Sequence, residues 1–335
     1  MRHRSTGPLV AATAAVLTAA LAACGTDAPA GTTATGPAQA ELLDVVSSTN
    51  VYGAVAQAVG GDLVEVTSLI DDPSADPHSY ETTPADAAAV AGADVVVFNG
   101  GGYDDFMTRL VESAGGEPKV IDVVALSGLA PAEDAEEHAG EEHAGEEHAG
   151  EEEGHAHGSF NEHVWYSLPT VQALAGRLAT DMGAADPANA ATFTANAERF
   201  STQVGELITE AGAVATAKPG ARVAVTEPVP GYLLQAAGLT DVTPEAFTEA
   251  VEEDTDPPAA ALAETLTLFG PPEPVAALIV NAQTTTPSTD QVRAAAQTGG
   301  VPVVEFTETL PEGTTDYPTW MGAQIDALSA ALNGN

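Results

Sequence analysis

The chain has 335 residues, of which 44% are hydrophobic, and this composition excludes a protein that is disordered throughout. Its length suggests about two domains, each with its own hydrophobic core. The formal net charge of −40 argues against binding to nucleic acid or to anionic membrane surfaces, and it favours cations or neutral molecules as partners.

The first 24 residues have the pattern of a lipoprotein signal peptide. Arg2 and Arg4 precede a short apolar run at 9–21, and the sequence LAAC at 21–24 is a lipobox in which Cys24 is lipidated. A transmembrane helix is the alternative, but it needs about 20 apolar residues. We therefore expect an exported protein, lipid-anchored to the outer face of the cytoplasmic membrane, with residues 25–40 as a flexible tether. Because Cys24 is the only cysteine, we expect no disulfide.

Between residues 42 and 124, apolar runs typical of buried strands alternate with stretches typical of helices. The expected strands are 42–48, 63–70, 94–98 and 119–124, and the expected helices are 51–59, 84–91 and 103–114. Such alternation predicts a parallel sheet, which binds ligands beyond the carboxyl ends of its strands. His78 lies in a Pro- and Asp-rich loop that follows one of these strand ends.

An acidic, histidine-rich tract occupies residues 130–158 and contains the sequence EEHAG three times, followed by EEEGHAHG. It cannot bury apolar surface, so we expect it to be disordered without a ligand. Its histidines are His138, His143, His148, His155 and His157. Exposed imidazoles among carboxylates bind zinc weakly and have little attraction for manganese, so the tract is a candidate accessory zinc-binding loop. The alternative is a solvated low-complexity linker.

Helical patterns resume at 168–182, and the Ala-rich stretch 187–217 would form a helix about 45 Å long, which suits a connector between two lobes. Strands are expected next at 222–226, 275–280 and 301–306, helices at 231–237, 259–269, 288–297 and 319–332, and acidic loops before residue 258. The sequence thus predicts an α/β fold with two lobes at 41–183 and 221–335. Each lobe has a parallel-rich sheet, and one long helix connects them.

Three polar residues, His78, His163 and Glu227, fall at predicted strand ends or element boundaries that are far apart in the sequence. Two imidazoles and a carboxylate that converge from two lobes would bind a first-row divalent cation. Each residue also has an ordinary structural interpretation: a turn residue for His78, a packed core histidine for His163, and a solvated turn acid for Glu227.

These segments together resemble the zinc- and manganese-binding solute-binding lipoproteins of bacterial ABC transporters. The resemblance rests on DPHSYE at 76–81, the His-rich insertion, EHVW at 162–165, and VTE at 225–227 followed by Gly231-Tyr232. It covers about residues 42–333. It implies two α/β lobes joined by one rigid helix, with the metal held between them. The sequence Asn-Glu before His163 departs from the Asp-Pro that is usual in this family.

The resemblance also implies a set of metal ligands. His78 matches the histidine of the Asp-Pro-His motif, and His163 matches that of the His-Val-Trp element. Glu227 stands at the third position, where manganese-type members have glutamate and zinc-type members usually have histidine. The fourth ligand is an acid after the later strand, and the matching segment here contains none. Asn281, Gln283, water or a carboxylate elsewhere would then complete the shell.

The function implied by the resemblance is capture of a divalent metal outside the membrane and its delivery to a permease and its ATPase, without catalysis and as a monomer. The two histidines and the accessory tract favour Zn²⁺ as the cargo, whereas more oxygen ligands would suit Mn²⁺. A manganese-specific protein of the same family is therefore one alternative. A zinc-dependent hydrolase is another, since two histidines and a glutamate also form catalytic sites. The third is a surface metal-buffering adhesin, in which the tract rather than the cleft binds metal.

Overall fold

The computed structural model describes residues 42–73, 75–130 and 160–334. The expected signal peptide with Cys24, the tether and the five histidines of the accessory tract lie outside the described residues. Among the helices that are described, none combines the length and the apolar character needed to cross a bilayer.

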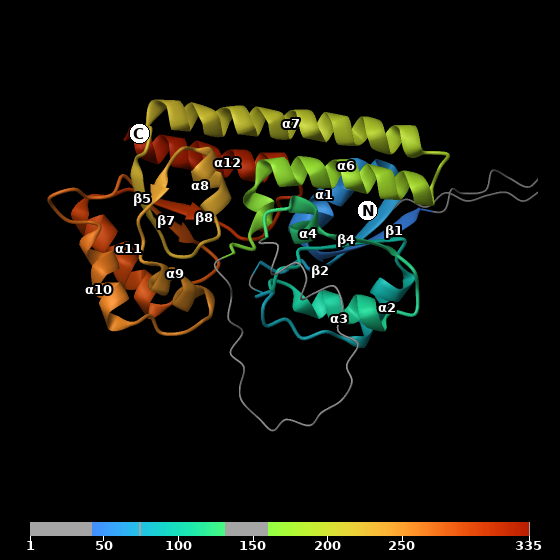
Figure 1. The fold of residues 1–335 in the computed structure, drawn as a ribbon, viewed down its shortest axis with the longest axis horizontal. Helices are drawn as coiled ribbons and strands as arrows, with labels where there is room; N and C mark the ends of the chain where they lie inside the picture. The colour runs from blue at the N-terminus through green and yellow to red at the C-terminus, as the bar shows by residue number, and fades with distance from the viewer. Residues whose placement is uncertain (1–41, 74, 131–159, 335) are drawn as a thin grey trace, which may run out of the picture. The chain divides into compact units, whose positions relative to one another are not determined.

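The first lobe is built on a sheet of four parallel strands in the order β2-β1-β3-β4. The strands are β1 (Leu43–Thr49), β2 (Val64–Ile70), β3 (Val95–Phe98) and β4 (Lys119–Asp122). The helices are α1 (Asn50–Gly60), α2 (Pro84–Gly92), α3 (Asp105–Ser113) and α4 (Val123–Ser127). Successive strand residues face opposite sides of the sheet, so Val45 packs with α1 while Val46 packs with α2 and α3. Figure 1 shows α1 and α3 on opposite sides of this sheet.

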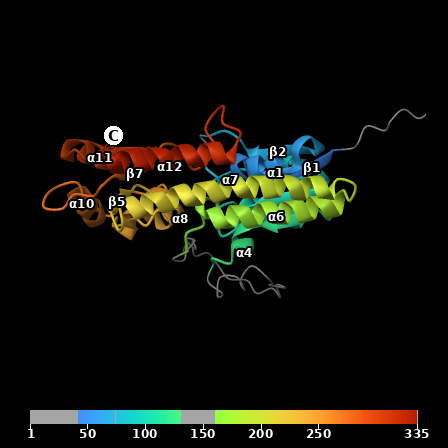
Figure 2. The ribbon, with the colours of Figure 1, turned by 90° about the horizontal axis from the view of Figure 1, so that it is seen from above.

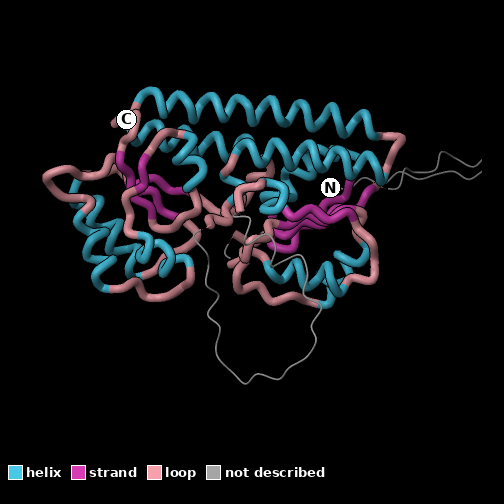
Figure 3. The backbone as a smooth tube through the Cα atoms, in the orientation of Figure 1, coloured by secondary structure: helices cyan, strands magenta, loops and turns pink. Residues whose placement is uncertain are grey.

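The second lobe repeats this arrangement with a parallel sheet in the order β6-β5-β7-β8. Its strands are β5 (Arg222–Val225), β6 (Thr240–Asp241), β7 (Leu278–Asn281) and β8 (Val303–Phe306). Its helices are α8 (Gly231–Ala236), α9 (Glu245–Glu252), α10 (Ala259–Thr267), α11 (Pro287–Gly299) and α12 (Tyr317–Asn333). Helices α9, α10 and α11 share one hydrophobic core with this sheet. Figure 3 shows the strands gathered into two separate sheets.

The long helix α7 (Ala190–Ala217) has 28 residues, a length of about 42 Å, and it spans both lobes. It packs against α1 and α6 (Leu168–Ala185) of the first lobe and against α8 and α12 of the second, as Figure 2 shows for α6 and α12. Its buried residues recur every three or four positions, so one apolar stripe faces the rest of the protein. The predicted two-lobed α/β fold with a long helix is therefore confirmed.

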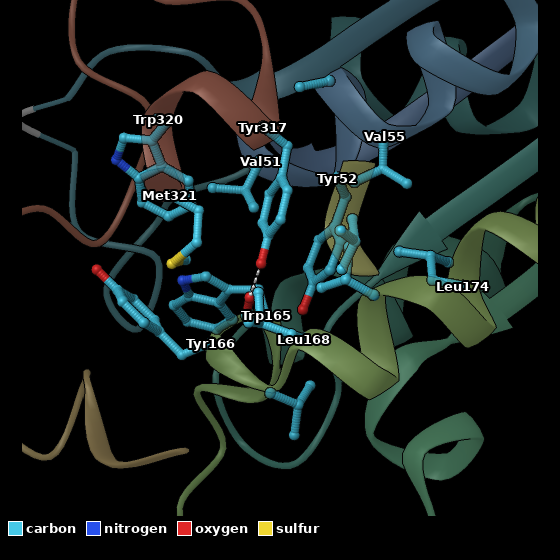
Figure 4. Close-up of a cluster of buried hydrophobic side chains, with 14 of the residues drawn as sticks. Val51, Tyr52, Val55, Trp165, Tyr166, Leu168, Leu174, Tyr317, Trp320 and Met321 are labelled. Atoms are coloured by element: carbon cyan, nitrogen blue, oxygen red, sulfur yellow. Dashed lines mark hydrogen bonds between the residues drawn. The ribbon is translucent and has the colours of Figure 1, made fainter. Parts of the chain in front are cut away.

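One hydrophobic core continues from the first lobe into the second. Its centre is aromatic: Tyr52 of α1, Trp165 and Tyr166 of the short helix η2 (Val164–Tyr166), and Tyr317 and Trp320 of α12 lie together in Figure 4. The Tyr317 hydroxyl donates to the Trp165 carbonyl oxygen at 2.7 Å. This core fixes η2, and with it the adjacent His163, between the two lobes.

Several segments differ from the sequence-based expectation, among them the short strand β6, which forms where an acidic loop was expected. The strand expected to continue to residue 124 ends at Asp122, because the Asp122 carboxylate accepts from the Ala125 backbone N–H at 2.8 Å and starts α4. Helix α9 forms where acidic loops were expected, because Phe247, Ala250 and Val251 are buried and give it an apolar face.

Candidate metal centre

A cavity of about 260 Å³ lies where loops of the two lobes face each other. The first lobe contributes Pro73 and residues 75–78, which follow β2, together with His163. The second lobe contributes the loops that follow β5, β7 and β8 and the end of α9. The cavity thus lies beyond the carboxyl ends of strands of both sheets, the usual place for a ligand in parallel α/β folds.

The structure brings His78, His163 and Glu227 together, because all three line this cavity. His78 and Glu227 lie in the loops that follow β2 and β5, and His163 immediately precedes η2. His163 and Glu227 are only 1% and 4% exposed, so neither is a solvated surface residue.

Both histidines are oriented by the same kind of contact, with a side-chain oxygen of the residue two positions earlier. Asp76 Oδ1 accepts from the His78 backbone N–H at 2.9 Å and lies 3.1 Å from its Nδ1. Asn161 Oδ1 likewise accepts from the His163 backbone N–H at 3.0 Å and lies 2.8 Å from its Nδ1. When Nδ1 carries the hydrogen in such a contact, Nε2 is left as the atom that can bind a metal.

The protonation of the two histidines differs because their surroundings differ. Burial lowers the pKa of His163 to about 4, so its ring is neutral at neutral pH. Burial alone would also lower the pKa of His78, but its hydrogen bonds to Asp76 and Glu162 and the charge of Glu308 outweigh burial and raise this pKa to about 11. His163 is thus ready to bind a cation, whereas His78 must first release a proton.

Glu227 offers a carboxylate oxygen that makes no hydrogen bond within the described part of the chain. Its Oε2 accepts from Asn281 Nδ2 at 2.6 Å, while its buried Oε1 has no hydrogen-bond partner among the described residues. Burial raises the pKa of Glu227 to about 8. A buried oxygen without a partner is costly to the fold, and a bound cation would satisfy it.

Sequence reasoning missed four acids at the cavity or beside it. Glu162 Oε1 lies 3.5 Å from His78 Nε2, and Glu252 Oε1 lies 3.2 Å from His163 Nε2. Asp254 and Glu308 line the cavity. Burial raises the pKa of Glu252 to about 9, whereas the hydrogen bond to His78 outweighs burial and lowers the pKa of Glu162 to about 2.

Glu308 carried a signal that sequence analysis could have used. Like Glu227, it stands two residues beyond the end of a strand, here β8. Its Oε1 accepts from the hydroxyl of Tyr103, a first-lobe residue, at 2.6 Å, and its Oε2 lies 3.3 Å from Asn281 Nδ2. Burial raises its pKa.

Asn281 and Gln283, the predicted candidates for a fourth ligand, have structural partners here. Asn281 Oδ1 accepts from the Gln283 backbone N–H at 3.0 Å, and its amide nitrogen faces Glu227 and Glu308. Gln283 Oε1 accepts from the backbone N–H groups of Glu308 and Thr309 at 2.7 and 2.9 Å. The two amides therefore hold the loops after β7 and β8 against each other. As metal ligands they remain predictions.

Comparison with known proteins places this site in context. Residues 45–331 match the family model described as zinc-uptake complex component A, periplasmic. The manganese-binding lipoprotein MntA of Halalkalibacterium halodurans is 29% identical over 167 residues, which cover 50% of this chain and 48% of that protein. The high-affinity zinc uptake system protein ZnuA of Paracoccus denitrificans is 29% identical over 225 residues, 62% of this chain and 68% of that protein. The chain spans about half the length of the manganese-binding relatives that it matches.

Solved structures share the fold. The protein SBP FpvC of Pseudomonas aeruginosa, in complex with Ni²⁺, has a TM-score of 0.67 and 22% identity, covering 88% of this chain and 98% of that one. The periplasmic zinc-binding protein TroA of Treponema pallidum has a TM-score of 0.66 and 18% identity, with coverages of 87% and 99%. At these identities the likeness concerns the fold alone.

Proposed function

Because the chain belongs to the zinc-uptake complex component A family of periplasmic proteins, we propose that it is an extracytoplasmic solute-binding protein for a divalent metal ion. It captures the ion and delivers it to an ABC permease with its ATPase. The observation that carries this proposal is the convergence of His78, His163 and Glu227 on one cavity between the lobes. The buried, unpartnered Oε1 of Glu227 is the feature that a cation would satisfy.

The proposed ligands are His78 Nε2, His163 Nε2 and a carboxylate oxygen of Glu227, joined by Glu308. We assign this fourth role to Glu308 in preference to Asn281 and Gln283, because Glu308 brings a carboxylate, a usual ligand of divalent ions, to the cavity lining, whereas the other two offer only neutral amide oxygens. Imidazole nitrogens with carboxylate oxygens form a donor set that suits first-row divalent ions.

We propose Zn²⁺ as the cargo. Two imidazoles in the cavity support zinc, and so does the sequence of the histidine-rich tract. Mn²⁺ is the second candidate, because carboxylates outnumber imidazoles around the cavity and manganese prefers oxygen ligands. The names of the relatives include both metals.

We further propose that Cys24 carries the lipid that anchors the protein outside the cytoplasmic membrane. The relatives MntA of Halalkalibacterium halodurans and of Bacillus subtilis are named lipoproteins. Labelling with a radioactive fatty acid should mark the wild-type protein, and Cys24→Ala should abolish the label.

A competitive titration of the metal-stripped protein with Zn²⁺ and Mn²⁺ tests the function. We expect one tight site in the full chain and in a variant lacking residues 136–157, and no tight site in His163→Ala. A surface metal buffer predicts instead that the deletion removes nearly all bound metal. Elemental analysis of the purified protein would identify the ion that it carries.

The same titration should depend on pH. An ion that binds His78 and Glu227 displaces protons from groups whose pKa values are raised to about 11 and about 8. Affinity should therefore rise from pH 5 to pH 8, with protons released on binding. Affinity that is constant over this range would contradict the ligand assignment.

A further inference from the structure

We propose that Glu252, at the C-terminal end of α9, is an additional ligand of the captured ion. This inference rests on the proposed function and extends the ligand set to a helix that was not expected from the sequence. Glu252 lines the cavity, and its side chain is only 15% exposed. Its buried Oε1 makes no hydrogen bond to a described residue, but it lies 3.2 Å from His163 Nε2.

The network around Asn161 fixes the tautomer of His163. Asn161 Nδ2 donates to the Pro228 carbonyl oxygen at 2.8 Å, and its Oδ1 accepts from the His163 backbone N–H. Oδ1 is therefore an acceptor, so the hydrogen of the neutral His163 ring must lie on Nδ1, 2.8 Å from it. Nε2 then presents a lone pair to the cavity.

Glu252 Oε1 faces this lone pair at 3.2 Å. A carboxylate oxygen and an imidazole lone pair are both acceptors, and at this distance they repel each other unless a proton or a cation lies between them. A proton between His163 Nε2 and Glu252 Oε1 would remove the repulsion of this pair alone. A cation would also satisfy the unpartnered Oε1 of Glu227, which lines the same cavity.

The spacing of the donor atoms also fits a shared ion. Two ligands bound tetrahedrally at about 2.0–2.2 Å lie about 3.3–3.6 Å from each other. The distance of 3.2 Å between His163 Nε2 and Glu252 Oε1 is close to this range. His78, Glu162 and Glu252 each offer a ligand atom within 4.8 Å of the others.

The chain supplies a matched control for Glu252 in the adjacent Glu253, which is exposed. Glu252→Gln and Glu253→Gln make the same change of charge at neighbouring positions. We would measure the dissociation constants of both variants for Zn²⁺ and Mn²⁺, and the visible absorption of their Co²⁺ complexes, which reports coordination.

We expect Glu252→Gln to weaken Zn²⁺ binding by about tenfold or more and Mn²⁺ binding by a larger factor, because the lost ligand is an oxygen. The Co²⁺ spectrum should change in Glu252→Gln and stay as in the wild type in Glu253→Gln. Glu252 could instead only contact His163 Nε2 in the metal-free protein and leave when the ion binds. Glu252→Gln should then leave the affinity for metal unchanged or raise it, and this result would overturn the inference. An equal loss for both metals with an unchanged Co²⁺ spectrum would overturn it too.

Failure of this inference is distinguishable from failure of the proposed function. If the wild type binds metal tightly, His163→Ala does not, and Glu252→Gln behaves as Glu253→Gln, only the role of Glu252 is wrong. If the wild type itself binds no divalent ion tightly, the proposed function is wrong.

Discussion

Glu227 combines a proposed role in metal binding with a cost to the stability of the metal-free protein. It is 4% exposed, one of its oxygens has no hydrogen-bond partner among the described residues, and burial raises its pKa to about 8. A carboxyl group whose pKa is higher in the folded state than in the unfolded state favours folding less as the pH rises between the two values. The metal-free protein should therefore lose stability from this group between about pH 4.5 and pH 8.

Glu227→Gln should raise the stability of the metal-free protein at pH 8 by about 1–3 kcal/mol, because it removes the cost of burying a charge. The gain should be much smaller at pH 5, where Glu227 is protonated in the folded state. Urea unfolding at both pH values measures it, with the exposed Glu206→Gln as the control. A variant that is less stable than the wild type at pH 8 would show that the Asn281 hydrogen bond matters more than the buried charge.

At the scale of elements, the sequence predicts best those segments whose patterns are long. Helix α7 carries its apolar stripe along most of its 28 residues, and strands β3 and β7 are uninterrupted or nearly uninterrupted apolar runs. Helix α9 has only Phe247, Ala250 and Val251 as an apolar face among many acids, which is a weak helical pattern. The segment is stabilised as a helix because this face is buried in the core that it shares with the sheet. Glu252 was missed because its helix was missed.

Glu308 was missed for a different reason. The strand order β5-β7-β8 brings the loops after all three strands to one edge of the sheet, and this order cannot be read from the sequence. The resemblance implies a fourth ligand after β7, where the chain has no acid, whereas Glu308, which lines the cavity, follows β8. His78, His163 and Glu227 were found because each lies in a local motif that is contiguous in the chain.

The end of α9 should respond to a change of backbone conformation. Asp254 has φ +53°, a left-handed value that suits glycine, and no other non-glycine residue in the described ranges has a positive φ. Asp254→Gly should stabilise the protein by about 0.5 kcal/mol. Gly300→Ala at the C-cap of α11 makes the opposite change and should destabilise the protein by about 1 kcal/mol, because Gly300 has φ +72°, which alanine disfavours. No atom lies close enough to clash with the added Cβ, so the backbone alone causes this loss. Urea unfolding measures both. A loss of stability in Asp254→Gly would mean that its carboxylate stabilises the fold by more than the backbone relief.

At the scale of the whole molecule, the two lobes are tied together by a common core and by hydrogen bonds. The Tyr166 hydroxyl donates to the Thr307 carbonyl oxygen at 2.6 Å, and Asn50 makes two hydrogen bonds to the backbone of Leu310. Helix α7 covers this junction along its length. Such continuity opposes independent unfolding of the lobes.

We therefore expect urea to unfold the protein in one transition that is the same by far-ultraviolet and near-ultraviolet circular dichroism. Added Zn²⁺ should move this single transition to higher urea, because the proposed ligands come from both lobes. Two separate transitions, or a shift of only one of them, would show that the lobes fold independently.

The position of Trp165 gives the molecule an optical reporter of its own site. The chain has two tryptophans. The ring centroid of Trp165 lies 5.0 Å from the ring centroid of His163 and 4.5 Å from that of Tyr103. A change of charge at His163 therefore occurs in contact with an indole that is shielded from water. Under the proposed function, tryptophan fluorescence would follow the arrival and departure of the metal in real time, without a label, and Trp320→Phe leaves Trp165 as the only tryptophan.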